Sequence, residues 1–572
     1  MKKTTLFSVQ LLICLLFAYG YSVSQENPDP KPQLTHEMSP EEQALKHLIG
    51  KDFYETNPPP SPVRNIAEWE HMEGVLISYA SWKAFGIPYS LIAEMSEDVI
   101  VYTIVENGSQ QNQVTNNYQS NGVNMSNVEF VVVPVDSYWT RDYSPWYITT
   151  GNDEVAIINF PYNRPNRPND DDIPIEMANY FNISLYGMDV IHTGGNYMTD
   201  GMHISASTTL VDDENNIYDS ELLQRVEDYC GITTYHWVED PNGEYIDHID
   251  CWGKFLDVDK ILIRSVPTSH NQYDEIEDVV DYFEGQTSAY GTPYEIYRVY
   301  TPSDQPYSNS LILNNKVFVP LKNSQWDDDA IATYEDAMPG YDVMGIYAGS
   351  ADWNSTDALH CRTHGVADRG LLHIYHVPIT GLQPYQSQYE IVADIFPYSG
   401  QSLTSTQIYY QVNGSSFESV NMTLVSGRTY HGYIPVCAGG DCEIGYYIYA
   451  ADGSGRTANH PYIGAPDPHL FNIDTATGIE EYQSAEIGSY NMPNPFRAYT
   501  TIYYTLPEGY YGDVNISVFN MNGMLLKKFP TQQKRGGKHN IVFIANDMPG
   551  GIYYYEVQAG NYRTSNRIVH IK

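Results

Sequence analysis

The feature that most limits how this chain can fold is a change in its hydrophobic pattern near residue 376. From about residue 61 to residue 375, short apolar runs alternate with segments of helical period. The clearest examples are predicted buried strands at 128–133, 260–263 and 316–319 and predicted helices at 221–229 and 274–283. Because strands and helices alternate over this length, we predict a mixed α/β unit for residues 61–375.

Beyond this unit the pattern is that of strands alone. Apolar residues alternate at period two over 407–412 and 444–449, and turns rich in Gly, Asn and Ser separate such runs. We therefore predict a β-sandwich over residues 376–475. A further β segment is predicted over residues 485–572, with strands around 552–555 and 568–569.

The first residues have the pattern of a secretory signal peptide, which we predict over residues 1–20. Lys2 and Lys3 precede an apolar run that ends at Ala18, and small residues follow at the spacing that cleavage requires. No later segment contains the roughly 18 consecutive apolar residues of a membrane span, so no transmembrane segment is predicted. Residues 21–60 are rich in Pro, Glu, Gln and Asn, which predicts a linker or pro-segment that cannot bury a core.

The charge of the chain excludes some classes of partner. There are 71 acidic and 30 basic residues, which gives a formal net charge of −41. Such a surface repels nucleic acid and anionic membranes, and it favours cationic ligands. Most of this charge is expected simply to keep a secreted protein soluble.

The cysteines divide into one close pair and several isolated thiols. Cys437 and Cys442 flank two glycines, which predicts a small disulfide loop in an oxidising compartment. Cys230, Cys251 and Cys361 have no obvious partner in the sequence. An unpaired thiol in a secreted protein is a candidate for chemistry.

The first candidate for chemistry is the stretch from His248 to Cys251. If it is a strand, His248 and Asp250 share one face and Cys251 points the other way. A histidine and a carboxylate presented together suit acid–base work on a cationic substrate. The alternative is a buried, hydrogen-bonded pair with a structural role.

The second candidate is Cys361, which has His360, Arg362 and His364 close by in the sequence. Positive neighbours lower the pKa of a thiol and make it a better nucleophile, which we predict for Cys361. One alternative is a zinc site that uses Cys361 and His364, although no second Cys/His pair with matching spacing is present. The other alternative is an inert buried cysteine.

The third candidate is Asp142, which lies between Trp139 and Trp146 in a turn-rich stretch. A carboxylate beside an indole ring can receive a flat cation, because it accepts two N–H bonds while the ring adds a cation–π attraction. The alternative is a surface loop with an internal ion pair. Two weaker signals are a tight turn at 194–196 and Asn309, which is expected to project from the end of a strand.

Together these residues suit the hydrolysis of a guanidinium group. Asp142 and Asp250 can hold the cation, Cys361 can attack its central carbon, and His248 can carry protons. No metal or organic cofactor is required for this chemistry. The acidic clusters at 170–172 and 327–329 are compatible with a structural calcium or sodium ion.

The same residues resemble the guanidino-group-modifying (pentein) superfamily, and within it the porphyromonad-type peptidylarginine deiminases. The segments that carry this resemblance are YWTRDY, NRPND, TGGNYMTDG, DPNGEYI, DCWGK, NSLILNN and DALHCRTH. The resemblance covers residues 61–475 and implies a five-bladed α/β propeller followed by an immunoglobulin-like domain.

The resemblance also implies a role for each matching residue. Cys361 is implied to be the nucleophile that forms an amidino-thioether, and His248 the general acid and base. Asp142 and Asp250 are implied to bind the guanidinium, while Asn309 positions the site and Trp139 packs on the substrate arginine.

The arginines that grip the carboxylate of the substrate are a further implied element. They correspond to Arg164 and Arg167, but the stretch is one residue longer here than in the family pattern, at Asn166. If both arginines reach the site, the preferred substrate is a peptide that ends in arginine.

The tail from residue 485 resembles the C-terminal sorting domain of proteins exported by the type IX secretion system. The segments NMPNPFRAYTTIYYTLP, FNMNGMLL and MPGGIYYYEV carry this resemblance. It implies a β-sandwich sorting domain, contact with the secretion machinery, and export across the outer membrane of a Gram-negative bacterium.

We therefore expect a secreted or surface-attached enzyme that converts arginine in peptides or proteins to citrulline and ammonia. The runner-up is a deiminase of agmatine or free arginine, although such relatives are typically cytosolic single domains. A third hypothesis is a non-catalytic surface adhesin built on an enzyme scaffold. A substrate panel and an ammonia assay separate the three.

Overall fold

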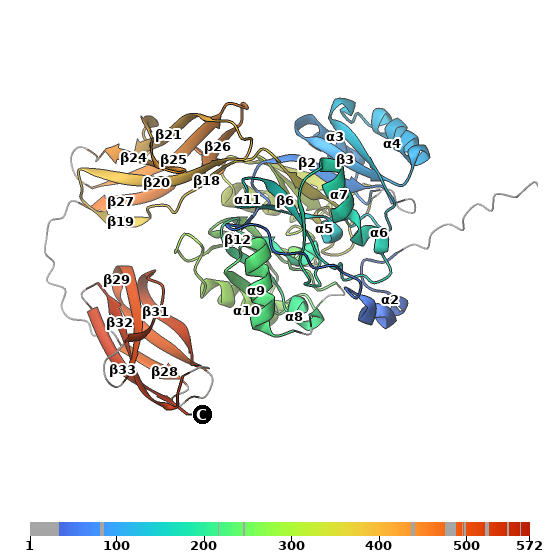
Figure 1. Cartoon of the computed structure of the whole chain (residues 1–572). Coiled ribbons are helices and arrows are strands. Elements are labelled where there is room, and N and C mark those ends of the chain that lie inside the picture. The colour runs from blue at the N-terminus through green and yellow to red at the C-terminus, as the bar shows by residue number, and fades with distance from the viewer. Residues whose placement is uncertain are drawn as a thin grey trace, which may run out of the picture.

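The structure is a computed structural model that describes residues 34–571, apart from short gaps. The gaps lie at 81–84, 216, 244–245, 350, 436, 438–440, 475–487, 493, 495, 497–498, 521–524, 546–547 and 561. The predicted signal peptide at 1–20 and the first part of the predicted pro-segment lie outside the described residues. Figure 1 shows a mixed α/β region in blue to yellow-green, an all-β region in yellow to orange, and a second all-β region in red.

The mixed α/β region repeats one arrangement five times. In each repeat a strand pairs antiparallel with the next strand, and a helical crossover then leads to a parallel strand on the other side. The first sheet has the order β17 (His364–Ala367), β2 (Met72–Ser78), β3 (Ile100–Val105), β4 (Val128–Val132). Its crossover helices are α3 (Tyr89–Asp98) and α4 (Gly108–Ser120), and a short turn η2 (Met125–Asn127) precedes β4. Because β17 comes from the end of the region and β2 from its start, this sheet joins the two ends.

The second sheet has the order β1 (Arg64–Asn65), β5 (Trp146–Thr149), β6 (Val155–Asn159), β7 (Leu185–Gly187). Helices α6 (Pro168–Asp171) and α7 (Ile173–Phe181) form its crossover. The third sheet has the order β10 (Thr234–Val238), β9 (Ile204–Thr208), β8 (Met198–Thr199). Its crossover contains α8 (Leu210–Glu214) and α9 (Asp219–Cys230).

The last two sheets have three strands and one crossover helix each. The fourth contains β11 (Gly253–Asp257), β12 (Lys260–Ser265), β13 (Glu295–Tyr300) and helix α10 (Tyr273–Glu284). The fifth contains β14 (Leu311–Leu313), β15 (Lys316–Leu321), β16 (Asp342–Tyr347) and helix α11 (Asp327–Ala337). The mixed α/β class predicted for residues 61–375 is confirmed, because helices and parallel strands alternate throughout the region.

Burial explains both the agreement and one error at the level of single strands. The apolar stretches 261–263 of β12 and 317–319 of β15 are buried, as predicted. Strand β4 exists where a strand is predicted, but only Val131 in it is buried. The reason is that β4 forms the edge of its sheet, so a run of valines there is half exposed.

The part of the predicted pro-segment that the structure describes is folded against the mixed α/β region. Helix α2 (Pro40–Leu45) and the turn η1 (Lys46–Leu48) form there, and Ser39 and Glu42 make a capping box at the start of α2. Residues 21–60 are predicted not to bury a core, and the residues that the described part buries are polar: His36 and Glu42 are each only 3% exposed. Both are polar residues whose partners lie in the mixed α/β region, so an apolar pattern could not reveal them.

The first all-β region consists of two sheets that share one apolar core. One sheet has the order β18 (Leu372–Tyr375), β20 (Gln388–Pro397), β24 (Thr429–Pro435), β23 (Thr423–Ser426). The other has the order β19 (Gly381–Pro384), β27 (His469–Asp474), β25 (Cys442–Asp452), β21 (Leu403–Val412), β22 (Glu418–Asn421), and β26 (Thr457–His460) pairs with β25. The core includes Ile391 from the first sheet and Ile408 and Ile448 from the second. Cys437 and Cys442 form the predicted disulfide.

The second all-β region, from residue 488, forms a single hydrogen-bonded sheet rather than the two sheets of the predicted sandwich. Its strands are β28 (Gly488–Met492), β29 (Tyr499–Asn520), β30 (Leu525–Lys528), β31 (Gln532–Ile544), β32 (Gly551–Ala559) and β33 (Tyr562–His570). Strand β29 is long enough to pair with β28 near its start and with β32 near its end, so it joins the two halves. Side chains of both halves of β29, such as Ile502 and Ile516, lie in the same core.

Within the described residues, helices that are both long and apolar enough to cross a membrane are absent.

Candidate active site

Five turns meet at one point of the mixed α/β region, one from each repeat. Each turn lies directly before the first strand of its antiparallel pair. They are α5 (Thr140–Tyr143) before β5, η3 (Gly194–Asn196) before β8, η4 (Ile249–Cys251) before β11, Asn309 before β14, and η5 (His360–Arg362) before β17. Turn α5 contacts η3 and η5, and η3 contacts η4. Equivalent positions of the five repeats therefore bring together residues that are distant in the sequence.

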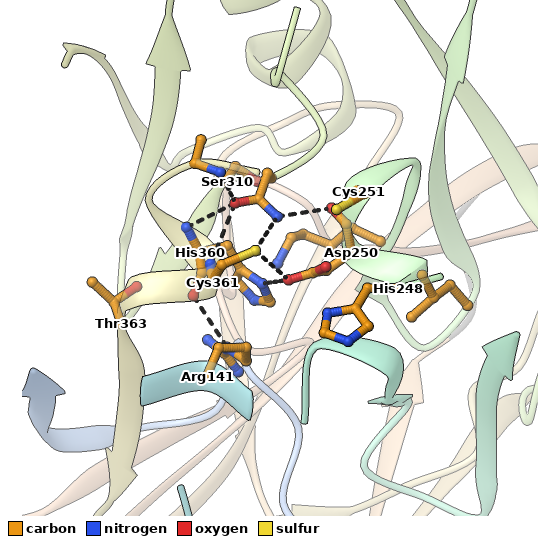
Figure 2. Close-up of polar contacts among 12 residues, drawn as sticks. Arg141, His248, Asp250, Cys251, Ser310, His360, Cys361 and Thr363 are labelled. Carbon is orange, nitrogen blue, oxygen red and sulfur yellow. Dashed lines mark hydrogen bonds and ion pairs between the residues drawn. The ribbon is translucent and has the colours of Figure 1, made fainter. Parts of the chain in front are cut away.

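Cys361 lies in turn η5 and is fully buried. Its thiol donates to Asp250 Oδ2 at 3.5 Å and accepts from Asn309 Nδ2 at 3.2 Å. Figure 2 shows Cys361 and His360 both directed toward Asp250. Burial, followed by the neighbouring thiol of Cys251 and the carboxylate of Asp250, raises the pKa of Cys361 well above its ordinary value. The thiol is therefore protonated in this state.

The prediction that positive neighbours lower the pKa of Cys361 is wrong for this structure. The guanidinium of Arg362 donates to the carbonyl oxygens of Gly86 and Asp352 instead of facing the thiol. His364 lies near the carbonyl oxygen of Pro145, at 3.1 Å from its Nε2. Neighbours in the sequence point in different directions here because η5 is a tight turn.

Asn309 holds the turn that carries Cys361. Its Oδ1 accepts the backbone N–H groups of Ala358, His360 and Cys361 at 3.0, 3.1 and 3.3 Å. Its Nδ2 donates to the backbone oxygen of Asp250 at 3.2 Å. Asn309 therefore ties η5 to η4 and fixes the distance between the thiol and Asp250.

His248 and Asp250 lie close together, but not for the predicted reason. The stretch is a 3-10 turn with His248 as its N-cap, so the alternation of a strand does not apply. Cys251 consequently does not point away, because its sulfur lies within 4.8 Å of Asp250 and Cys361. Burial lowers the pKa of His248 to about 4, so its imidazole is neutral at neutral pH.

Several buried atoms of the site lack a hydrogen-bond partner among the described residues. They are both ring nitrogens of His248 and the Oδ1 atoms of Asp142 and Asp250. Buried polar atoms are usually paired, so this group of atoms suits a bound polar ligand. The Oδ1 atom of Asp142 lies 3.6 Å from Nδ1 of His248, which places both beside the same space.

Gly195 explains the glycine pair in the sequence. A Cβ atom at this position would lie 2.5 Å from His248 Nδ1 and 2.8 Å from Asp142 Oδ1. Any side chain would therefore displace two residues of the site. The tight turn predicted at 194–196 is present, and its function is to let His248 and Asp142 approach.

Asp142 is completely buried, and its second oxygen is paired with a residue that the sequence did not reveal. His36 Nε2 lies 2.6 Å from Asp142 Oδ2, and His36 Nδ1 lies 2.8 Å from Asp357 Oδ2. The His36 ring stacks on Trp139 with centroids 4.6 Å apart. Burial opposes ionisation of Asp142, but the charges of His36 and His248 outweigh it and lower the pKa of this carboxyl.

Arg164 and Arg167, from the stretch that is one residue longer than the family pattern, both lie at the candidate site. Arg164 Nε donates to the backbone oxygen of His36 at 3.1 Å, and Arg167 Nε donates to Glu42 Oε1 at 2.9 Å. Their exposed fractions are 4% and 0%. The extra residue at Asn166 therefore turns neither guanidinium away from the site.

A second layer of charge supports Asp250. His360 Nδ1 lies 2.7 Å from Asp250 Oδ2, and His360 Nε2 lies 2.8 Å from Glu68 Oε2. Glu68 is paired in turn with Lys254 at 3.1 Å. Burial would raise the pKa of Glu68, but Lys254 and His360 lower it well below its ordinary value.

The structure brings together every site residue predicted from the sequence, and it adds four. The predicted residues are Cys361, His248, Asp142, Asp250, Asn309, Trp139, Arg164 and Arg167. The added residues are His36, Glu68, Asp357 and His360. Asp357 and His360 lie in the DALHCRTH segment and could have been found there, whereas His36 and Glu68 carry no local signal.

The same cluster offers atoms that could bind a metal ion. Three overlapping groups have ligand atoms within 4.8 Å of one another: His36, Asp142 and His248; His36, Asp357 and Cys361; Asp250, Cys251 and Cys361. Among the described residues, no such group includes His364, so the predicted Cys361–His364 zinc alternative finds no support. Cys230 lies in an apolar core away from this cluster, where burial raises the pKa of its thiol to about 12.

Comparison with protein-family models gives two matches. The model described as Porphyromonas-type peptidyl-arginine deiminase matches residues 64–366, which is more than half of the chain. That range begins with β1 and ends in β17, so it covers the five repeats. The model described as secretion system C-terminal sorting domain matches residues 492–572.

Individual relatives are more distant. A candidate agmatine deiminase from Yersinia pseudotuberculosis is 22% identical over 329 residues, which cover 49% of this chain and 89% of the relative. The crystal structure of a candidate agmatine deiminase superposes with a TM-score of 0.49 at 17% identity, covering 55% of this chain and 98% of that one. A candidate arginine deiminase from Porphyromonas gingivalis superposes with a TM-score of 0.47 at 16% identity, covering 53% and 98%.

Proposed function

Since this chain belongs to the Porphyromonas-type peptidyl-arginine deiminase family, we propose that its substrate is arginine in peptides or proteins, with a preference for C-terminal arginine. The chain is a deiminase, a hydrolase that acts on the carbon–nitrogen bonds of an amidine group. Its C-terminal sorting domain indicates export across the outer membrane, to the cell surface or the medium. The proposed products are peptidyl-citrulline and ammonia.

The proposed binding step uses the carboxylates and the indole ring of the site. Asp142 and Asp250 each have a buried oxygen without a hydrogen-bond partner among the described residues, and a guanidinium offers flat N–H groups to such oxygens. Trp139 provides a face on which a flat cation already stacks, as His36 does here. Binding thus fixes the central carbon of the guanidinium beside the thiol of Cys361.

The proposed attack starts from a protonated thiol. A guanidinium bound next to Cys361 adds a positive charge, which favours the thiolate and offsets the effect of burial on its pKa. His248, neutral at neutral pH, takes the proton of the thiol. The sulfur then forms a bond to the guanidinium carbon and gives a tetrahedral intermediate.

The proposed later steps release ammonia and citrulline and regenerate the free enzyme. His248 gives the proton to one terminal nitrogen, the carbon–nitrogen bond breaks, and ammonia leaves an amidino-thioether on Cys361. Water, deprotonated by His248, adds to the same carbon. The carbon–sulfur bond then breaks and releases the ureido group of citrulline. The hydroxyl proton of the intermediate passes to the sulfur, which restores the thiol of Cys361, and His248 releases its proton to water.

One observation supports a peptide substrate over agmatine. The site in this structure holds a segment of polypeptide, with the side chain of His36 among the carboxylates and its backbone oxygen on Arg164. Agmatine has no carbonyl or carboxyl group to offer Arg164 or Arg167. The carboxylate of a C-terminal arginine does, and the two buried arginines would bind it through charge-assisted hydrogen bonds.

The experiment is a substrate panel. The rate of ammonia release is measured with agmatine, free arginine, a peptide with internal arginine, and a peptide ending in arginine. We expect the highest kcat/KM for the terminal arginine. Faster turnover of agmatine would favour the runner-up function, which the agmatine deiminase relatives also suggest. Failure to release ammonia from any of them, in the wild-type chain and in His36→Ala alike, would favour the adhesin.

Independence from metals and cofactors is part of the proposal, because thiol, imidazole and carboxylates account for each step. Exhaustive chelation should leave activity unchanged, whereas loss that only zinc restores would assign a metal to the groups around His248 and Cys361. A structural calcium or sodium ion remains a separate proposal. Asp170 and Asp327 already accept hydrogen bonds from Ser137 and Tyr307, so an ion is not needed to satisfy them.

The finer architecture is also proposed. We infer that the five repeats are blades of an α/β propeller, since each sends one turn to the common site. The β-sandwich that follows is proposed to be immunoglobulin-like. Its first sheet starts at Leu372 in β18, slightly before the predicted boundary at residue 376.

A further inference from the structure

The residues from Leu34 to Leu48, which we name the plug segment, occupy the proposed substrate site. Leu34 packs against the small cluster formed by Trp139, Cys361 and neighbouring side chains. His36 is 3% exposed and lies deeper, among the catalytic residues. A connecting segment with no function in the site would be expected on the surface, as most loops are.

His36 meets the chemical demands of the site on a guanidinium. Its two ring nitrogens are paired with Asp142 and Asp357, and its flat ring stacks on Trp139 at an interplanar angle of 13°. One ligating nitrogen of His36 also lies within 4.8 Å of the sulfur of Cys361. A protonated imidazole is a flat cation with two N–H donors, so it imitates the group that the enzyme attacks.

The other end of the plug segment places a carboxylate where the carboxylate of the substrate is proposed to bind. Glu42 pairs with Arg167 at 2.9 Å, and Arg167 Nη2 also donates to the backbone oxygen of Thr35 at 2.5 Å. Arg164 donates to the backbone oxygen of His36. The two arginines proposed to bind the substrate carboxylate are thus both occupied by this segment.

Local structure shapes the segment for this contact. The capping box of Ser39 and Glu42 starts α2, and the Glu42 carboxylate accepts both the backbone N–H of Ser39 and the guanidinium of Arg167. The groups facing His36 are Asp142, Asp357, His248 and Arg164. They lie in α5, just before η5, at the N-cap of η4, and between β6 and α6, respectively. The two carboxylates lie against the two ring nitrogens of His36 and stabilise the cationic form of its imidazole.

We propose that the plug segment is a built-in inhibitor, which keeps this protein a precursor of low activity until a protease that cuts after basic residues removes it. This inference rests on the proposed function, because it assigns the plug to the substrate site of that function. Lys46 and Lys51 are the basic residues between His36 and Arg64, and both are exposed. Hydrolysis of the peptide bond after either lysine frees a fragment held only by non-covalent contacts.

The first test compares substitutions in the full chain. His36→Ala should raise kcat/KM for a peptide ending in arginine by about 10- to 100-fold, because two charge-assisted hydrogen bonds of the plug are lost. Glu42→Gln should raise it by a smaller factor. The matched controls are His47→Ala and Glu41→Gln, exposed residues of the same segment, which should change nothing.

A second readout does not depend on turnover. Alkylation of Cys361 by iodoacetamide is followed by mass spectrometry of the peptide that contains it. We expect faster labelling in His36→Ala than in the wild-type chain or in His47→Ala. If labelling accelerates while every variant lacks activity on arginine, the plug is supported and the proposed function fails. Equal labelling rates in all variants would overturn the plug.

The third test concerns removal. Brief treatment of the wild-type chain with trypsin, stopped at intervals, should raise kcat/KM as cleavage after Lys46 or Lys51 appears. The double variant Lys46→Gln/Lys51→Gln should resist both the cleavage and the activation. Cleavage at these lysines without any gain in activity or in Cys361 labelling would contradict the inference.

Discussion

The catalytic centre and the core of the β-sandwich are equally buried but are built from opposite chemistry. Asp142 and Cys361 are 0% exposed, and so are Ile391 and Ile408. The catalytic centre contains charges and polar atoms that lack a hydrogen-bond partner among the described residues, such as both ring nitrogens of His248. The sandwich core is formed by aliphatic and aromatic side chains from two sheets, together with the disulfide cysteines.

This difference separates what each region contributes. Burial of apolar surface stabilises a fold, whereas burial of unpaired polar groups costs stability unless a ligand satisfies them. Substitutions in the sandwich core should therefore lower the free energy of unfolding and leave kcat/KM unchanged. Substitutions in the catalytic centre should lower kcat/KM without lowering the free energy of unfolding.

The largest effect is expected for Cys361→Ala. The only proposed nucleophile is removed, so kcat/KM should fall by about 10⁴-fold or more, both in the wild-type chain and combined with His36→Ala. Thermal unfolding should be unchanged, because the lost contacts are two weak hydrogen bonds of a thiol. The control variant is Cys230→Ala, whose kcat/KM should stay near the wild-type value. Substantial turnover by Cys361→Ala would refute the assignment of the nucleophile.

The opposite pattern is expected for Ile391→Ala in β20. Truncation of a fully buried isoleucine should lower the free energy of unfolding of the sandwich by about 2–5 kcal/mol. Below the unfolding transition, kcat/KM should match the wild-type value. Urea unfolding followed together with activity provides the measurement. The neighbouring Val392, 40% exposed, supplies the control Val392→Ala. A large loss of activity without a loss of stability would contradict the view that the sandwich core contributes stability and not catalysis.

The two regions also differ in how much of them the sequence could predict. Period-two alternation is a local signal, so β21 and β25 lie where it predicts strands. The catalytic centre was predicted only as a set of residue types in order. Its geometry depends on turns, and the stretch from His248 to Cys251 was mistaken for a strand because a short apolar and polar alternation also fits a 3-10 turn.

Contacts across long sequence distances account for what was missed. His36 meets Asp142 and Asp357 across 106 and 321 residues of chain, and nothing near His36 in the sequence announces this. The pKa of Cys361 shifts in the direction opposite to the prediction, because the thiol is buried and its basic neighbours in the sequence do not face it. Burial of a thiol follows from the packing of the five repeats, which no local pattern contains.

An intermediate effect is expected at the rim of the catalytic centre, for Arg164→Ala. One charge-assisted hydrogen bond to a substrate carboxylate is worth roughly 10- to 150-fold in preference. In the His36→Ala background, the ratio of kcat/KM for free over amidated C-terminal arginine should therefore fall toward one. Arg225→Ala, on an arginine paired with Glu55 and Glu221 outside the site, is the control. An unchanged ratio would mean that Arg164 does not bind the carboxylate of the substrate.

The smallest effect is expected from pH, and it tests whether the plug depends on charge. Burial alone would lower the pKa of His36, but the carboxylates of Asp357 and Asp142 raise it above its ordinary value. A histidine whose pKa is raised in the folded state contributes its contacts at low pH and loses them as pH rises through that pKa. The ratio of kcat/KM for His36→Ala over wild type should accordingly be largest below about pH 6.5 and shrink as the pH rises through the raised pKa of His36, by at most about tenfold per pH unit. Taking this ratio cancels the titrations of Cys361 and His248 to the extent that both chains share them.

His36→Lys keeps a cation to higher pH, so inhibition in that variant should persist at pH values where inhibition of the wild-type chain is relieved. A ratio that stays constant across this range, or that rises with pH, would show that shape rather than charge holds the plug in the site.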